Sequence, residues 1–221
     1  MAASMSVNGT RQRLLDAAEA CFAEEGFAGA SLRAITRRAE ANLAAVHYHF
    51  GSKKALFGAV FARHIEPINR ERLERLDALE RDAGDRPVVL EELVRAFVEP
   101  ACSIAGCPDQ GARFLRLSGR MFSEPGAHWE PVRHLMEPLK RRYVEAFSRS
   151  LPGMSTAEVF WRLHFLIGAL SHALASGTML TYFSEGTCDG EDLGDMVTQL
   201  VPFLTAGMSA RNVEPARGAA R

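Results

Sequence analysis

Several features that would indicate a metal site or a membrane segment are missing from this sequence. Cysteine is scarce, and the four that occur have no metal-ligand spacing, because the nearest pair reads CSIAGC rather than CxxC. We therefore expect reduced thiols and no bound metal. No apolar run approaches the roughly 20 residues that a transmembrane helix needs, and no signal peptide is visible. These features predict a cytoplasmic chain that has no membrane partner.

Catalytic motifs are missing as well. The histidines form no HExxH pair, and the chain contains no GxSxG, no Walker loop and no GxGxxG. Acidic residues are frequent, but no pair of them lies in the apolar surroundings that make a carboxyl group catalytic. We therefore expect neither an enzyme nor a cofactor.

The residues that are present predict an all-α protein. The 221 residues are 47% hydrophobic and 24% charged, and apolar side chains recur at helical spacing without strand-like alternation. A first helix is expected to begin at Thr10, and a long one to run from Ser52 to about Arg81, kinked or broken by Pro67. Breaks delimit further helices at 87–105, 109–123, 128–150, 155–183 and 190–210. The charge-dense residues 69–85 are expected to form a solvated helix face and then a loop.

The segment from Ser31 to Lys54 has the spacing of a helix-turn-helix. Ser31 and Asn42 are suitable N-caps for two short helices, and Gly51 is suited to end the second. The segment holds five Arg or Lys residues and a single acid, Glu40, although the whole chain has a formal net charge of -1. The positive charge is therefore local, which is typical of one surface that meets phosphates.

The chain from Leu14 to Phe57 resembles the N-terminal DNA-binding domain of TetR-type transcriptional regulators; it reads LLDAAEACFAEEGFAGASLRAITRRAEANLAAVHYHFGSKKALF. The resemblance implies a three-helix DNA-binding domain at residues 1–55 and a helical domain for effector binding and dimerisation at 56–221. Glu40 departs from the family, which commonly has glycine in this turn. The backbone at Glu40 is therefore expected to be strained or differently shaped.

The same resemblance implies which side chains contact DNA. Tyr48 and Lys53 match positions that meet the phosphate backbone in this family, whereas His47 and Arg33 are expected to read bases. For Arg33, a phosphate contact alone is the alternative. The full set of predicted DNA contacts is Ser31, Arg33, Thr36, Leu43, Ala44, His47, Tyr48 and Lys53.

The segment from Thr156 to Gly177 carries apolar side chains on two faces and therefore needs two packing partners. One partner is its own domain, and the resemblance favours a second copy of the chain as the other. The alternative is that both faces pack within one chain. The predicted interface residues are Leu163, Ile167, Leu170, Leu174, Val201 and Leu204.

The middle helices contain more bulky apolar side chains than a thin bundle requires, which is typical of a ligand pocket. An ordinary core is the alternative interpretation. Pro100, Pro131 and Pro138 are expected to kink helices and open space between them. Arg116 and Arg120, four residues apart, are candidate partners for an acidic head group. The predicted ligand-binding residues are Phe97, Phe114, Arg116, Leu117, Arg120, Met121, Trp129 and Phe165.

Two later segments resemble the fatty-acid-responsive PsrA-like branch of the same family; they read FWRLHFLIGAL from Phe160 and MVTQLVPFLTAGM from Met196. We therefore expect a homodimeric repressor that binds an inverted repeat in double-stranded DNA and is released by a long-chain fatty acid or acyl-CoA. A hydrophobic drug or an aromatic acid is the alternative effector. An architectural DNA-binding protein without an effector is the competing class, and about 140 residues of apolar helical chain beyond the DNA-binding part argue against it.

Overall fold

The computed structural model describes residues 2–105, 111, 114–115, 117–118 and 129–211. All regular structure in these ranges is helical, which confirms the predicted all-α class. The fully described helices are α1 (Ala2–Gly29), α2 (Leu32–Arg38), α3 (Leu43–Phe50), α4 (Lys53–Ala83), α5 (Leu90–Ala105), α7 (Trp129–Ser150), α8 (Thr156–Ala175), α9 (Gly177–Phe183) and α10 (Leu193–Ser209). The predicted helix at 109–123 lies mostly outside the described residues.

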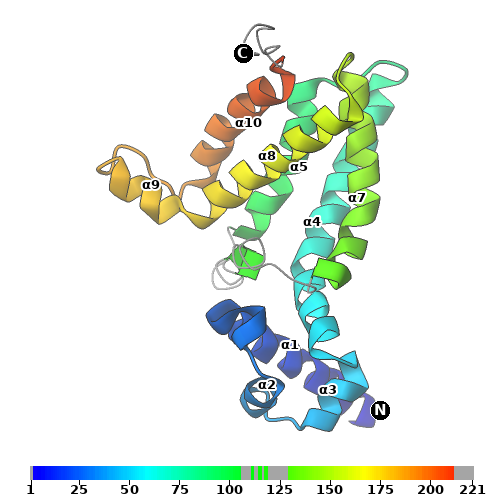
Figure 1. Cartoon of the computed structure of the whole chain (residues 1–221), viewed down its shortest axis with the longest axis vertical. Coiled ribbons are helices and arrows are strands. Elements are labelled where there is room, and N and C mark those ends of the chain that lie inside the picture. Colours follow the sequence, from blue (N-terminus) through cyan, green and yellow to red (C-terminus); the bar gives the residue numbers. More distant parts are fainter. Residues whose placement is uncertain (1, 106–110, 112–113, 116, 119–128, 212–221) are drawn as a thin grey trace, which may run out of the picture.

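The helices form an elongated molecule with two ends (Figure 1). Helices α1 to α3 make one end, and α4 leads from it into a bundle with α5, α7, α8 and α10. The short helix α9 projects sideways from the bundle. No single helix in the described ranges has the length and apolar character to cross a membrane, although α8 and α9 together, bent by 74°, satisfy both criteria.

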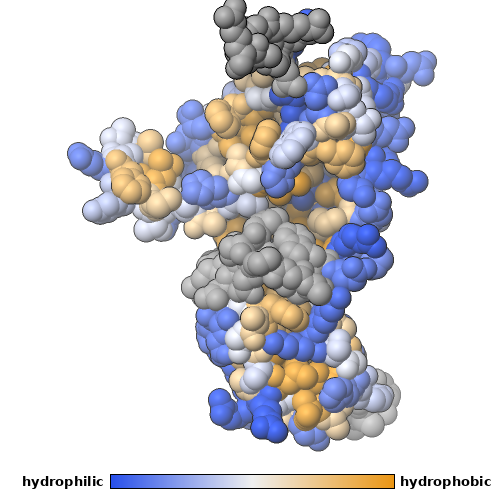
Figure 2. Space-filling model, viewed as in Figure 1, coloured by the Kyte–Doolittle hydropathy of each residue, from blue (hydrophilic) through white to orange (hydrophobic). Residues whose placement is uncertain are grey.

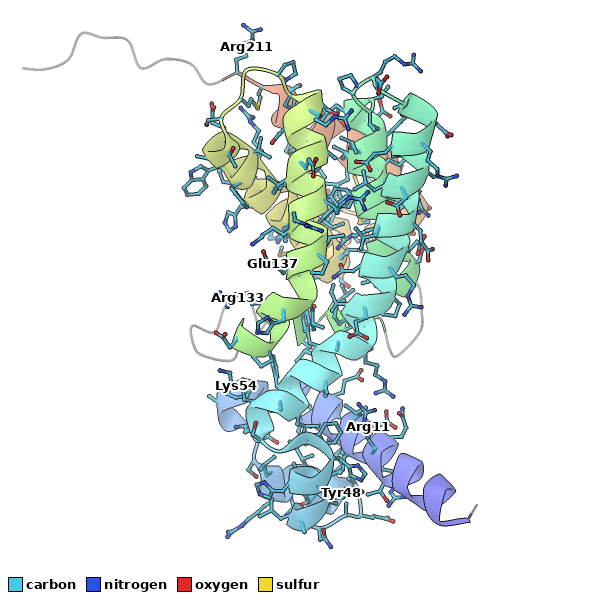
Figure 3. The ribbon with its side chains drawn as sticks, turned by 90° about the vertical axis from the view of Figure 1, so that its right-hand side faces the viewer. Arg11, Tyr48, Lys54, Arg133, Glu137 and Arg211 are labelled. Atoms are coloured by element: carbon cyan, nitrogen blue, oxygen red, sulfur yellow. The ribbon has the colours of Figure 1, made fainter. Side chains whose placement is uncertain are left out.

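Helix α4 connects the two ends and continues through Pro67 as one helix (Figure 3). The predicted break therefore does not occur, although the ribbon bends along its length. Ser52 caps the first turn of α4 by accepting a hydrogen bond from the backbone N–H of Ala55 at 3.1 Å. The predicted domain boundary after residue 55 falls in this first turn.

Two helix boundaries differ from the sequence prediction. Helix α1 begins at Ala2, so Thr10 lies inside it rather than at its start. The predicted helix at 155–183 is divided at Ser176 into α8 and α9. The division coincides with a close backbone approach, because a Cβ atom on either Gly177 or Gly190 would overlap the carbonyl oxygen of the other.

The interior consists of two apolar clusters. The first joins α1, α2, α3 and the lower part of α4 to the start of α7, and its buried side chains include Phe22, Ile35, Val46, Phe57, Phe61, Ile68, Phe114 and Val132. The second fills the bundle, and its buried side chains include Leu76, Val94, Phe97, Leu139, Tyr143, Phe147, Leu163, Leu166, Leu170, Val201 and Leu204. Because side chains of α4 as far as Ile68 belong to the first cluster, α4 is part of both ends.

Candidate nucleic-acid interface

Helices α2 and α3 form the predicted helix-turn-helix, and side-chain caps define where each begins. The hydroxyl of Ser31 accepts from the N–H of Ala34 at 3.1 Å, and the side chain of Asn42 accepts from the N–H of Ala45 at 2.8 Å. Ile35 and Val46 are fully buried beneath the two helices. Gly51 ends α3 with a φ of 79°, a conformation that favours glycine. These local contacts fix which face of α3 points outward.

The outward face of α3 consists of side chains available to a partner. Leu43 is 44% exposed and Tyr48 79% exposed, and Ala44 and His47 are exposed as well. Tyr48 lies at the end of the molecule opposite Arg211 (Figure 3). The predicted contacts on α3 therefore share one accessible surface at the tip of the molecule.

Thr36 does not belong to this surface. Its side chain is only 7% exposed, and its hydroxyl donates to the carbonyl oxygen of Arg33 at 3.2 Å within α2. A DNA contact at Thr36 stays a prediction, although its side chain is mostly buried in this conformation. The neighbouring Arg37 was not predicted as a site residue, yet it is exposed. Its place in the basic last turn of α2 was the available signal.

Only one of the two ring nitrogens of His47, Nδ1, forms a hydrogen bond within the described structure. Its Nδ1 lies 3.0 Å from the carbonyl oxygen of Gly51, an acceptor, so Nδ1 is the nitrogen that carries a proton in this contact. In the tautomer that donates from Nδ1, Nε2 is an acceptor on the exposed face of α3. An acceptor at this place fits the amino groups that adenine and cytosine show in the major groove.

The basic side chains around α2 and α3 are of two kinds. Within the described ranges, Arg33 and Arg37 are exposed and form no ion pair. Other cations hold the domain together: Arg13 donates to the carbonyl oxygen of Ala39 at 3.1 Å, and Arg38 pairs with Glu24 at 3.0 Å. Lys53 donates to the carbonyl oxygen of Ala28 at 3.4 Å and lies over the ring of Phe27. A phosphate contact by Lys53 remains a prediction, but the residue also ties α4 to α1.

The turn between α2 and α3 contains the expected conformational departure. Glu40 has a φ of 49°, in the left-handed region that an L-residue enters at a cost of roughly 1–2 kcal/mol. The N–H of Ala41 donates to the carbonyl oxygen of Thr36 at 3.0 Å and closes this turn. The backbone geometry usual for glycine is thus kept with glutamate in place.

A buried polar group links this DNA-binding end to the bundle. The carboxylate of Glu19 on α1 is hydrogen-bonded by Arg63 at 3.0 Å and lies 3.2 Å from Nε2 of His64, both on α4. The His64 ring stacks on Phe114 with centroids 4.9 Å apart. Glu19 and His64 are only 3% and 4% exposed. Because Phe114 stacks on His64, a shift of Phe114 would move His64 and so change the contact between α1 and α4.

The predicted ligand-binding residues whose side chains the structure describes do not converge on one site. Phe97 packs in the second cluster against Tyr143, whereas Phe114 and Leu117 belong to the first. Phe165 is 61% exposed on the outer face of α8, so its assignment to an internal pocket is wrong in this conformation. The predicted contacts that lie outside the described residues are Arg116, Arg120, Met121 and the side chain of Trp129.

The predicted dimer residues also need correction. Leu163, Leu170, Val201 and Leu204 are at most 7% exposed and belong to the core of a single chain, and Leu174 packs against the same core. Of the predicted set only Ile167, which is 37% exposed, faces outward. The second apolar face of α8 exists, but its exposed large side chains are Phe160, Trp161, Phe165 and Ile167.

Sequence comparison finds similar proteins that are named transcriptional repressors. HTH-type transcriptional repressor KstR of Rhodococcus jostii is 29% identical over 138 residues, which cover 55% of this chain and 62% of KstR. This chain thus spans less than two thirds of that relative.

Solved structures show the same fold at low sequence identity. The fatty acid degradation regulator FadR of Bacillus halodurans superposes with a TM-score of 0.61 at 14% identity, over 89% of this chain and 98% of that one. FadR of Bacillus subtilis in complex with stearoyl-CoA gives 0.54 at 13% identity, over the same shares.

Two family models together account for most of the chain. Residues 14–60 match the model described as bacterial regulatory proteins, tetR family, and residues 95–207 match the tetracyclin repressor-like C-terminal domain. The chain therefore belongs to the TetR family of bacterial regulatory proteins.

Proposed function

We propose that the chain is a homodimeric transcriptional repressor that leaves its operator when a long-chain fatty acid or acyl-CoA binds in the bundle. The observation that carries the DNA-binding part is the exposed α3 face, with His47 and Tyr48 outward and Val46 buried beneath. A twofold dimer presents two such faces, so the operator is an inverted repeat with half-site centres about 34–36 Å apart or a multiple of that distance.

The dimer is proposed to form through α8, α9 and α10. Figure 2 shows apolar surface gathered on α9 and on the neighbouring part of the bundle. The exposed large apolar side chains of these helices are Phe160, Trp161, Phe165, Ile167, Met179, Leu180, Tyr182, Phe183 and Phe203. Because apolar patches of this kind are uncommon on monomers, a partner surface is expected to cover them. A second copy fits, because self-association through one patch generates twofold symmetry.

Two observations support an acyl effector. The bundle has a core rich in aromatic and aliphatic side chains, and the structurally similar FadR of Bacillus subtilis was crystallised with stearoyl-CoA. Repressor names among the relatives, such as KstR, support the direction of regulation. Binding would act through α4, which is shared by both clusters and contacts α1 through Arg63 and His64. An effector that favours one arrangement of α4 by a few kcal/mol shifts the separation of the two α3 helices.

The test of this proposal is release of DNA that carries the operator. Operator-bound protein is titrated with saturated acyl chains of increasing length, as free acids and as thioesters, and release is measured by electrophoretic mobility shift. Each buried CH₂ contributes about 0.8 kcal/mol, so the concentration needed for release should fall steeply with chain length until the cavity is filled. Release only by a rigid aromatic acid or a hydrophobic drug would replace the acyl effector by that class.

The proposed interface is tested separately. Phe165→Glu places a charge on the exposed face of α8, and we expect sedimentation to show monomers with greatly weakened operator binding. Val89→Glu is the matched control, because Val89 is 62% exposed, about as much as Phe165, but precedes α5. A Phe165→Glu protein that remains dimeric would place the interface elsewhere.

A further inference from the structure

Asn69 and Arg72 on α4 are buried polar residues at the junction of the two apolar clusters. The side chains of Asn69 and Arg72 are 7% and 6% exposed, although the charged stretch around them predicts a solvated helix face. On α4, Ile68 belongs to the first cluster and Leu76 to the second. A polar layer therefore crosses the interior where α4 packs against α5 and α7 (Figure 1).

The guanidinium of Arg72 uses only part of its hydrogen-bonding capacity. Its Nε donates to the carbonyl oxygen of Phe97 at 2.7 Å, and Nη1 lies 3.5 Å from Oδ1 of Asn69, at the limit of a hydrogen bond. The ring of Phe97 packs against it, 3.8 Å from Cζ to the ring centroid. The outer edge of the guanidinium, which fits a carboxylate in two-point fashion, has no such partner in the described structure.

Arg72 also lacks a counter-charge. In the part of the chain that the structure describes, it makes no ion pair, whereas Arg75, one turn further along α4, pairs with both Glu71 and Glu99. Burial lowers the pKa of Arg72 from 12.5 to about 10, and only the nearby Tyr143 and Cys102 act against this. A buried cation without a carboxylate partner is costly, and an anion that pairs with it offsets part of this cost.

We propose that Arg72 is the receptor for the carboxylate of the effector, bound inside the bundle between the two apolar clusters. This inference rests on the proposed function, and it names the chemical class of the head group. Apolar side chains that could contact an aliphatic chain lie to either side of Arg72 along α4, with Ile68 in the first cluster and Leu76 in the second. A free carboxylate neutralises the buried guanidinium, but an acyl thioester has no charge at this position. The free acid is therefore the ligand, and Arg72 takes the role that the sequence assigned to Arg116 and Arg120.

The first experiment measures binding without DNA. Full-length protein is titrated by calorimetry with saturated acids of about eight to sixteen carbons, with their methyl esters and with their coenzyme A thioesters. We expect the wild-type protein to bind each acid about 10-fold to 100-fold more tightly than its ester, as for a hydrogen bond to a charged group. Arg72→Met should remove this preference while the affinity for the ester stays unchanged. Arg75→Met, which removes a half-exposed and already paired arginine, is the control that should leave the preference intact.

The outcomes separate this inference from the function on which it rests. If acids bind with a preference that depends on Arg72 but do not release the operator, the site stands and the proposed acyl response fails. If Arg72→Met keeps the preference, or loses acid and ester binding equally, Arg72 is a structural residue and the inference is wrong.

A second variant covers the case in which Arg72→Met does not fold. Arg72→Lys keeps the charge but cannot bind a carboxylate in two-point fashion, so it should keep a reduced preference for the acid. Acid labelled with ¹³C at the carboxyl group should show a carboxylate that stays ionised at lower pH when bound than when free. A bound carboxyl group that titrates as in water would overturn the assignment.

Discussion

Gly58 on α4 lies so close to Pro131 on α7 that a Cβ atom at position 58 would sit 2.5 Å from Cβ of Pro131. Non-bonded carbon atoms do not approach so closely, so any side chain at Gly58 must push α7 away from α4. This contact joins the DNA-binding end to the start of the helix that crosses the bundle. Its tightness makes the separation of α4 and α7 sensitive to a single methyl group.

Gly58→Ala should therefore lower the free energy of unfolding by about 1–3 kcal/mol, as overpacking does, despite the better helix propensity of alanine. Chemical denaturation measures the change. Gly9→Ala in α1 is the control, because its Cβ would meet nothing closer than 4.0 Å and should be neutral or slightly stabilising. Equal stability changes in the two variants would mean that α7 gives way without cost.

Glu40→Gly should raise the free energy of unfolding by about 0.5–1 kcal/mol. The native φ of 49° costs an L-residue more than it costs glycine, and the greater freedom of glycine in the unfolded chain offsets part of the gain. Glu40→Ala removes the same charge but keeps the strained conformation. If both variants gain stability equally, the charge of Glu40 rather than its backbone is responsible.

Arg33→Gln and Arg37→Gln should each reduce the slope of log affinity against log salt concentration by about 0.9, the value for one lost phosphate contact. The slope is measured by fluorescence anisotropy on operator DNA and on random duplexes. Arg38→Gln should change it less, because Arg38 is already paired with Glu24 at 3.0 Å. A change in the ratio of specific to random binding for Arg33→Gln would identify it as a base reader, as the sequence predicts.

Ionisation of the Cys102 thiol in the unfolded chain should lower the free energy of unfolding as the pH rises from 9 to 11. Burial raises the pKa of this thiol from 9.0 to about 11, so the unfolded chain loses its proton first and the folded state is disfavoured as pH rises. At pH 10 this amounts to about 1.4 kcal/mol relative to pH 7. Denaturation of the wild type and of Cys102→Ala at both pH values isolates the effect, since the variant lacks this share of the loss. Identical pH dependence in the two proteins would contradict it.

The parts of the structure that depend on local chemistry were predictable from the sequence. Ser31, Asn42 and Ser52 cap the helices that they were expected to cap, because the N-cap hydrogen bond closes within three residues. The exposed face of α3 followed from the four-residue spacing of its inward side chains. The strain expected at Glu40 is present, because its φ of 49° lies in the left-handed region.

The parts that depend on contacts between distant residues were not predictable. Thr36 and Arg72 look like surface residues in their own helices, and only packing against other elements buries them. Helix α8 has two apolar stripes, and the sequence pattern does not tell which one faces the core, so Leu163 and Leu170 were assigned to the wrong surface. The break before α9 coincides with the contact between Gly177 and Gly190, which lie thirteen residues apart in the sequence.

The meeting of Gly177 and Gly190 has a consequence for how this chain tolerates change. Because the two backbones touch, the intervening residues leave and re-enter the bundle at one point, and Thr181 secures the closure by accepting from the N–H of Gly190 at 2.9 Å. Changes in length between α9 and Gly190 are therefore expected to leave α8 and α10 where they are, provided that Thr181 is kept. A side chain at Gly177 or Gly190, in contrast, would have to push the two backbones apart.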